Sequence, residues 1–208
     1  MSGVMQRRWG ALLLARGERE QRPGASEATG TAMPSAQPDM PRPSFAEVYA
    51  QHFDFVWRSL RHLGVTPPAL DDAVQEVWLV VHQKLPLFEG RSKATTWLFG
   101  IALNIARSQR RKGRAVTSAE PLPDEVPSRS PDPEKTLVGQ DAWQQVQTFL
   151  ETLDDLPRAI FVSALLENLT PAETAEAIGI EVELVYRRVR ALRRAFARQL
   201  ARREESPT

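Results

Sequence analysis

The chain has 208 residues, of which 42% are hydrophobic and 25% are charged, so it has enough apolar material for one folded domain or two small ones. Its formal net charge is only +1, so nucleic-acid binding would have to come from local clusters of Lys and Arg. The absence of Cys excludes disulfides, thiolate metal sites and Cys nucleophiles. The three His residues are scattered, and we expect no metal and no cofactor.

The N-terminal segment, residues 1–43, is rich in Pro, Gly, Ala and Ser and has no sustained hydrophobic periodicity. We predict a disordered tail there. Its apolar run over residues 9–15 is interrupted by Gly10 and followed at once by Arg16, which is unlike the apolar core of a signal peptide. No stretch approaches the roughly 20 apolar residues of a membrane span. We therefore expect a cytoplasmic protein.

Helical periodicity begins after this tail. Ser44, with Glu47 three residues later, has the spacing of a capping box at the start of a helix, which we expect to end near Gly64. A second helix is predicted over residues 70–85 and a third over residues 94–111. The predicted core stripe of the second helix comprises Val74, Val77, Trp78, Val81 and Leu85.

A segment rich in Pro, Ser and acidic residues follows, and we predict a flexible linker over residues 115–139. Helical periodicity then resumes, with helices predicted over residues 159–167, 171–178 and 182–203, and no segment alternates in the manner of a strand. The sequence predicts an all-α fold with two small helical domains, residues 44–114 and 140–203.

The second predicted domain contains a helix-turn-helix pattern. Thr170, Pro171 and Glu173 are typical of a capped helix start, and Gly179 ends this short helix before a longer one begins at Val182. The longer helix has an apolar stripe and, opposite it, a basic face. Such a face can lie in a DNA major groove, although a solvated surface helix has the same pattern.

A polar face is also predicted on the helix over residues 70–85. Asp72, Gln75 and Glu76 lie on the side opposite the core stripe, together with the apolar Leu79. This combination fits either a solvated surface or a protein partner. Paired carboxylates, Asp71 and Asp72 with Glu76, also leave open a metal-dependent nuclease.

These motifs resemble those of bacterial RNA polymerase sigma factors. The stretch DAVQEVW, residues 72–78, is similar to their D-x-x-Q-E-x-F/W motif, and FEGRSKATTWLFGIALN, residues 88–104, is similar to the motif that follows it in the extracytoplasmic-function (ECF) group. Residues 156–188, with Leu156-Pro157, Ile178-Gly179-Ile180 and Val185, resemble the second DNA-binding domain of that group. A layout of two domains is typical of ECF sigma factors.

The resemblance implies a non-enzymatic initiation factor that binds core RNA polymerase and promoter DNA, and it implies control by an anti-sigma factor. The implied contacts with the clamp helices of the polymerase β′ subunit are Asp72, Gln75, Glu76 and Leu79. The implied residues for reading and melting the −10 element are Arg91, Ser92, Lys93, Thr95, Thr96, Trp97, Asn104, Arg107, Arg110 and Arg111. The implied residues for the −35 element are Glu183, Tyr186, Arg187, Arg188, Arg190 and Arg194.

The residue chemistry of the −10 segment is consistent with capture of an unpaired base. Hydroxyl groups and an amide can bond a base edge, and an aromatic ring can stack on its face, which contributes about 1–3 kcal/mol. The arginines at 107, 110, 111 and 114 fall on one helical edge and would bind phosphates. A helix-turn-helix regulator that works without polymerase, and a nuclease, are the competing hypotheses.

Overall fold

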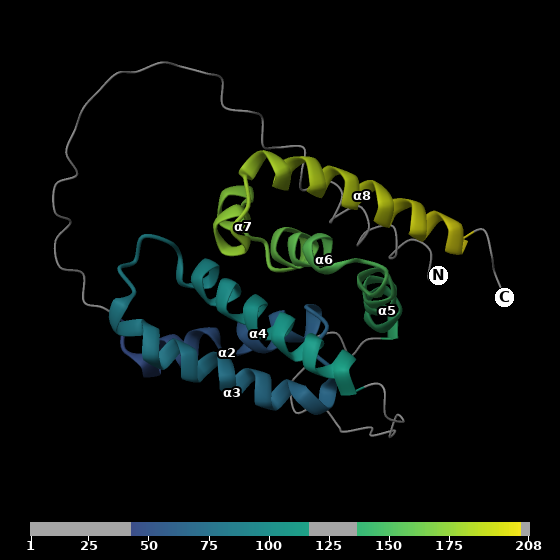
Figure 1. The fold of residues 1–208 in the computed structure, drawn as a ribbon. Coiled ribbons are helices and arrows are strands. Elements are labelled where there is room, and N and C mark those ends of the chain that lie inside the picture. The colour runs from purple at the N-terminus through teal and green to yellow at the C-terminus, as the bar shows by residue number, and fades with distance from the viewer. Residues whose placement is uncertain (1–42, 117–136, 205–208) are drawn as a thin grey trace, which may run out of the picture.

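The computed structural model describes residues 43–116 and 137–204, and every regular element in these two ranges is helical, as predicted (Figure 1). The predicted tail, apart from Pro43, and most of the predicted linker lie outside the described residues. None of the described helices is both long enough and apolar enough to span a bilayer.

The first helical unit contains α2 (Phe45–His62), α3 (Pro67–Lys84), the short 3₁₀ turn η1 (Leu85–Leu87) and α4 (Ala94–Val116). The predicted capping box is present at the start of α2. The backbone N–H of Ser44 donates to Glu47 Oε2 at 2.7 Å, and the Glu47 N–H donates to Ser44 Oγ at 3.3 Å. These two bonds satisfy backbone donors that the first turn of a helix leaves without partners.

Two helix boundaries differ from the predictions in this unit. The second helix begins at Pro67 rather than at residue 70, because a proline at the first helical position needs no N–H partner and already has a helical φ. The third helix continues to Val116 rather than ending at residue 111.

The second helical unit contains α5 (Leu137–Glu151), α6 (Asp155–Phe161), the π-helical turn η2 (Val162–Leu166), α7 (Pro171–Ile178) and α8 (Val182–Glu204). We predicted a single helix over residues 159–167. Instead α6 begins four residues earlier, since Pro157 falls in the first turn, where its missing N–H breaks no helical bond. The π turn replaces the second half of the predicted helix.

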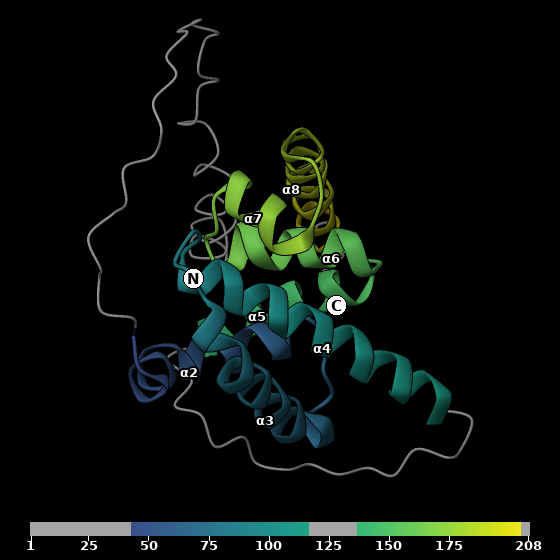
Figure 2. The ribbon, with the colours of Figure 1, turned by 60° about the vertical axis from the view of Figure 1, so that its left-hand side comes forward.

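The two units pack against each other around a continuous core. Figures 1 and 2 show the second unit lying across the first, with α7 next to α4. The predicted stripes contribute to this core: Val74, Val77, Trp78 and Val81 are buried in α3, and Val185, Leu192 and Phe196 are buried in α8. Tyr49 on α2 is exposed at the edge of an aromatic cluster with Phe45, Phe53 and Trp78.

Candidate nucleic-acid and protein interfaces

The polar face of α3 is largely open to solvent. Asp72 and Gln75 are exposed, and the large apolar side chain of Leu79 between them and the end of α3 is 64% exposed. Glu76 differs from its neighbours because it is half-buried and accepts a hydrogen bond of 3.0 Å from Nε2 of Gln109 on α4. The face is therefore an exposed strip with one carboxylate held in place by the next helix.

The loop before α4 turns at Gly90, whose φ of +69° lies in the left-handed region that glycine adopts without strain. Arg91 is exposed and forms an ion pair with Glu89. Ser92 and Thr95 are half-buried, whereas Thr96 is only 1% exposed and belongs to the core. Of the three predicted hydroxyl readers, Thr96 is thus the one whose side chain is covered.

Trp97 lies at the rim of the core. It is half-buried and stacks on Phe88 with ring centroids 4.8 Å apart and an interplanar angle of 29°. The sequence motif contained both residues but gave no indication of this stack. The pair forms an aromatic platform beside the loop that contains Arg91.

The basic edge of α4 is divided between solvent and the second helical unit. Asn104 and Arg111 are exposed and Arg107 is half-buried. In contrast, Nη2 of Arg110 lies 2.6 Å from Oδ1 of Asp155 on α6, and the Arg110 side chain is 16% exposed. The side chain of the fourth predicted arginine, Arg114, lies outside the described part of the chain.

Lys93 also reaches the second unit. Its Nζ lies 2.7 Å from Oε1 of Glu173 on α7. Glu173 in turn accepts the Thr170 backbone N–H at 2.8 Å, while the Glu173 N–H donates to Thr170 Oγ1 at 3.2 Å, which completes the predicted capping box. The hydrogen bond from Lys93, and then the one from the Thr170 backbone, lower the pKa of Glu173 below its ordinary value of 4.5.

The helix-turn-helix is present where the sequence predicted it. Gly179 follows α7 with a φ of +77°, and its N–H donates to the Ala175 carbonyl at 2.9 Å. This left-handed cap ends α7 and sets the direction of α8. In Figures 1 and 2, α8 lies on the side of the second unit that faces away from α2, α3 and α4.

The predicted basic face of α8 is fully presented to solvent. Val185, Leu192 and Phe196 anchor the opposite side of this helix in the core. All six residues proposed for the −35 element are exposed: Glu183, Tyr186, Arg187, Arg188, Arg190 and Arg194. This is the geometry that a recognition helix requires to enter a major groove.

No cluster of three or more His, Cys, Asp or Glu side chains that could hold a metal ion occurs within residues 43–116 and 137–204.

Comparison with known proteins agrees with this arrangement. Residues 48–116 match the family model of sigma-70 region 2. The chain is 29% identical over 186 residues to the ECF RNA polymerase sigma factor SigE of Mycolicibacterium smegmatis, covering 86% of this chain and 70% of SigE. It is 26% identical over 154 residues to the RNA polymerase sigma factor CnrH of Cupriavidus metallidurans, covering 70% and 81% of the two chains.

Solved structures show the same fold. The sigma factor RpoE of Bartonella quintana, in complex with the anti-sigma factor NepR, has a TM-score of 0.61 at 21% identity, over 76% of this chain and 96% of RpoE. CnrH in complex with the cytosolic domain of CnrY has a TM-score of 0.57 at 22% identity, over 76% and 87%. A two-unit helical protein with a helix-turn-helix and a sigma-70 region 2 is a transcription initiation factor. The chain belongs to the ECF group of bacterial RNA polymerase sigma factors.

Proposed function

We propose that this sigma factor has three functional surfaces. The exposed face of α3 binds core polymerase, the start and the basic edge of α4 read the −10 element, and α8 reads the −35 element. The observation that carries the proposal is the exposure of both the α3 face and the α8 face on opposite sides of one folded chain. The protein acts in the cytoplasm, where it meets polymerase and promoter DNA.

The polymerase contact is built from Asp72, Gln75 and Leu79, with Glu76 oriented by Gln109. Leu79 supplies the apolar centre of the contact and the polar side chains around it supply its rim, which is the usual composition of a protein interface. Burial of Leu79 against the β′ clamp helices stabilises the complex by about 1.5–3 kcal/mol if it is covered fully.

The −35 contact uses the N-terminal half of α8 for base edges and the later arginines for phosphates. Arg187 and Arg188 can form bidentate hydrogen bonds to guanine, each contributing about 1–3 kcal/mol of discrimination. Glu183 can accept a hydrogen bond from a cytosine amino group. Arg190 and Arg194, further along the exposed face, bind the backbone and give an affinity that falls with salt.

The −10 contact combines the loop at Arg91, Ser92 and Thr95 with the aromatic platform of Phe88 and Trp97. A base that leaves the duplex stack places its edge against the loop. Asn104, about two helical turns after Trp97, offers a further donor and acceptor. Arg107 and Arg111 bind the phosphates that flank the base. Lys93 and Arg110 belong to the same surface when they are not paired with the second unit.

Regulation by an anti-sigma factor is also proposed. Two structurally similar sigma factors are bound by other proteins, RpoE by the anti-sigma factor NepR and CnrH by the cytosolic domain of CnrY. These similarities support a protein inhibitor for this chain as well.

These assignments are tested by in-vitro transcription of genomic fragments with purified core polymerase and this chain, followed by mapping of the start sites. We expect specific starts that require both the polymerase and this chain. A regulator that works without polymerase would bind its DNA sites in the absence of the enzyme and would add no new starts, and that result would reject the proposal.

A further inference from the structure

The start of α2 and the end of α3 together form an aromatic surface, which comprises Phe45, Tyr49, Phe53, Trp78 and His82. The Phe45 ring makes edge contacts with Trp78 and His82, with ring centroids 6.0 Å and 5.3 Å apart. The Tyr49 ring lies 4.7 Å from that of Trp78 and 5.3 Å from that of Phe53. Trp78 forms the buried floor, whereas Tyr49 is 40% exposed and His82 is exposed. Contiguous apolar side chains at a protein surface mark interaction sites, unlike single ones.

The aromatic surface adjoins the α3 face that is assigned to polymerase. His82 lies three residues after Leu79, and Gln75 lies three residues before Trp78. Residues at this spacing are neighbours on a helix. The two surfaces therefore share a border along α3, and an occupant of one lies against an occupant of the other.

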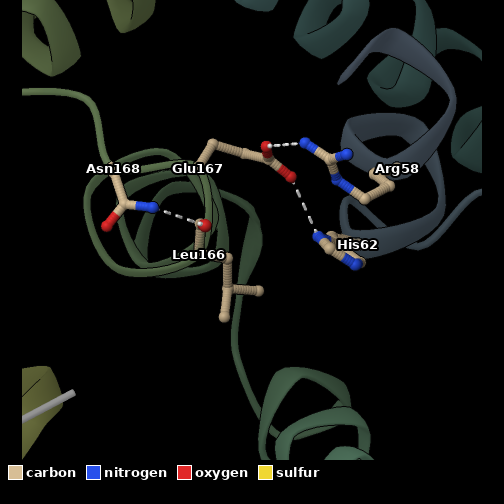
Figure 3. A network of polar contacts seen from close by, with 5 residues as sticks. All are labelled: Arg58, His62, Leu166, Glu167 and Asn168. Atoms are coloured by element: carbon tan, nitrogen blue, oxygen red, sulfur yellow. Dashed lines mark hydrogen bonds and ion pairs between the residues drawn. The ribbon is translucent and has the colours of Figure 1, made fainter. Parts of the chain in front are cut away.

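The charges around the aromatic surface are acidic. Over residues 45–57 and 67–82, the Asp, Glu, Lys and Arg positions hold carboxylates alone: Glu47, Asp54, Asp71, Asp72 and Glu76. Arginines appear in α2 only from Arg58 onward. Figure 3 shows Arg58 and His62 directed toward Glu167 of the second unit, at nitrogen–oxygen distances of 3.3 Å and 3.2 Å. A partner of the aromatic surface therefore has to combine apolar side chains with positive charge.

One segment of this composition lies in the part of the chain outside the described residues. Residues 7–16, RRWGALLLAR, place a Trp and a run of Leu between Arg8 and Arg16. The other such stretches, residues 117–136 and 205–208, contain at most isolated apolar residues. The chain itself thus supplies a segment that is complementary to the aromatic surface.

The chain enters the described structure beside this surface. Ser44 caps α2, and the next residue, Phe45, belongs to the aromatic surface. Residues 17–42 connect the segment to this point, and a coil of this length spans roughly 25–30 Å. Tethering over such a distance gives an effective concentration on the order of 1 mM, so even a weak contact is populated.

We propose that residues 7–16 dock on the aromatic surface. The side chain of Trp9 and the leucines lie against Phe45 and Tyr49, and the flanking arginines lie beside the carboxylates of α2 and α3. Because the docking site borders the polymerase face, the docked segment competes with core polymerase, and binding of the enzyme releases it. This competition rests on the proposed function of α3, whereas the docking does not.

Substitutions in the segment disrupt docking without altering the two helical units. Leu12→Asp combined with Leu13→Asp interrupts the apolar run and brings negative charge toward the carboxylates of α2 and α3. Ala32→Asp combined with Ala36→Asp adds the same charge elsewhere in the N-terminal part of the chain. This second pair is the matched control for the change in net charge.

The aromatic surface offers a variant on the other side of the contact. Tyr49→Ala removes its most accessible ring. Tyr186→Ala is the matched control for docking, because Tyr186 is 46% exposed and lies on α8, in the other helical unit. Circular dichroism verifies that all variants stay helical.

Docking is measured as the distance between spin labels on cysteines introduced at Gln6 and at Gln51, which is exposed on α2, in a chain that has no native Cys. We expect a narrow distance component in the parent and in both controls. Its population should fall at least about threefold in the Leu12 and Leu13 double variant and in Tyr49→Ala.

A parent chain without a narrow component, or a component that survives in both docking variants, would overturn the proposal. Dilution with unlabelled chain should leave the component unchanged. Its loss on dilution would show that the segment binds a second copy instead, which would also overturn docking within one chain.

Competition is measured as the affinity for purified core polymerase. We expect the Leu12 and Leu13 double variant to bind at least about threefold more tightly than the parent, because release of the segment raises the binding-competent fraction. The Ala32 and Ala36 control should bind like the parent. Unchanged affinity in a double variant that has lost the narrow component would overturn the competition.

Leu79→Ala then separates the causes. If this variant still weakens polymerase binding, the assignment of the α3 face stands and only the competition is wrong. If it has no effect, the assignment of the α3 face fails, and the label distances still decide whether the segment docks.

Discussion

Gln109 on α4 donates a hydrogen bond of 3.0 Å to the carboxylate of Glu76 on α3. The bond connects the face assigned to polymerase with the helix assigned to the −10 element. The same bond explains why Glu76 is less exposed than Asp72 and Gln75, its neighbours on that face.

The apolar centre of the α3 face is tested by Leu79→Ala. Leu79 is 64% exposed, so its truncation should leave the free energy of unfolding nearly unchanged. The affinity for core polymerase, measured by fluorescence anisotropy, should fall about tenfold or more, in line with the loss of a buried Leu at an interface. Leu87→Ala is the matched control, because Leu87 is 79% exposed and lies outside this face. Equal losses for the two variants would show that Leu79 has no special role.

The basic edge of α4 is tested by Arg110→Ala combined with Arg111→Ala. We expect weaker binding across unrelated promoter sequences and a shallower dependence of the logarithm of affinity on the logarithm of salt concentration, by roughly 0.7–0.9 per phosphate contact removed. Lys84→Ala, which removes one exposed charge on α3, gives the effect of each unit of net charge lost away from this edge. An unchanged slope in the double variant would contradict phosphate binding by this edge.

The turn of the helix-turn-helix is tested by Gly179→Ala. No atom lies within 4 Å of a Cβ at this position, so the cost comes from the φ of +77° alone, and we expect a loss of about 1–2 kcal/mol in the free energy of unfolding. Gly113→Ala, in a helical and open position, should instead be neutral or stabilising by up to about 1 kcal/mol. Urea unfolding of both variants measures the difference, and a destabilisation of similar size at the two positions would argue against the left-handed cap.

The capping carboxylates predict a difference in acid stability. The pKa of Glu173 is lowered on folding, so the stability it contributes is present above its ordinary value of 4.5 and is lost as the pH falls through the folded value. Glu173→Gln should therefore destabilise the protein at neutral pH and have progressively less effect below pH 4.5. Glu47→Gln, in the capping box of α2, is the comparison, since the pKa of Glu47 is lowered by Ser44 without a lysine. The melting temperature, measured as a function of pH, should fall more for Glu173→Gln than for Glu47→Gln. Equal decreases would mean that Lys93 contributes nothing to the stability.

The local features of the fold could be predicted because they depend on residues close in the sequence. The capping boxes at Ser44 and Thr170 and the glycine cap at Gly179 follow from side-chain chemistry within four residues. The core stripes of α3 and α8 follow from helical spacing in the same way.

The contacts between the two units could not be predicted. Arg58 and Glu167 are separated by 109 positions, and a pattern within one helix carries no information about such a pair. For the same reason the sequence indicated a free basic edge on α4, whereas Arg110 is engaged by Asp155.

The most direct test of the central claim is transcription by purified core polymerase on genomic fragments, with the parent chain, Leu79→Ala and Leu87→Ala compared side by side. The account predicts discrete start sites that depend on the added chain, a strong loss of transcript with Leu79→Ala and none with Leu87→Ala. Transcripts that are independent of the chain, or fully retained with Leu79→Ala, would contradict it.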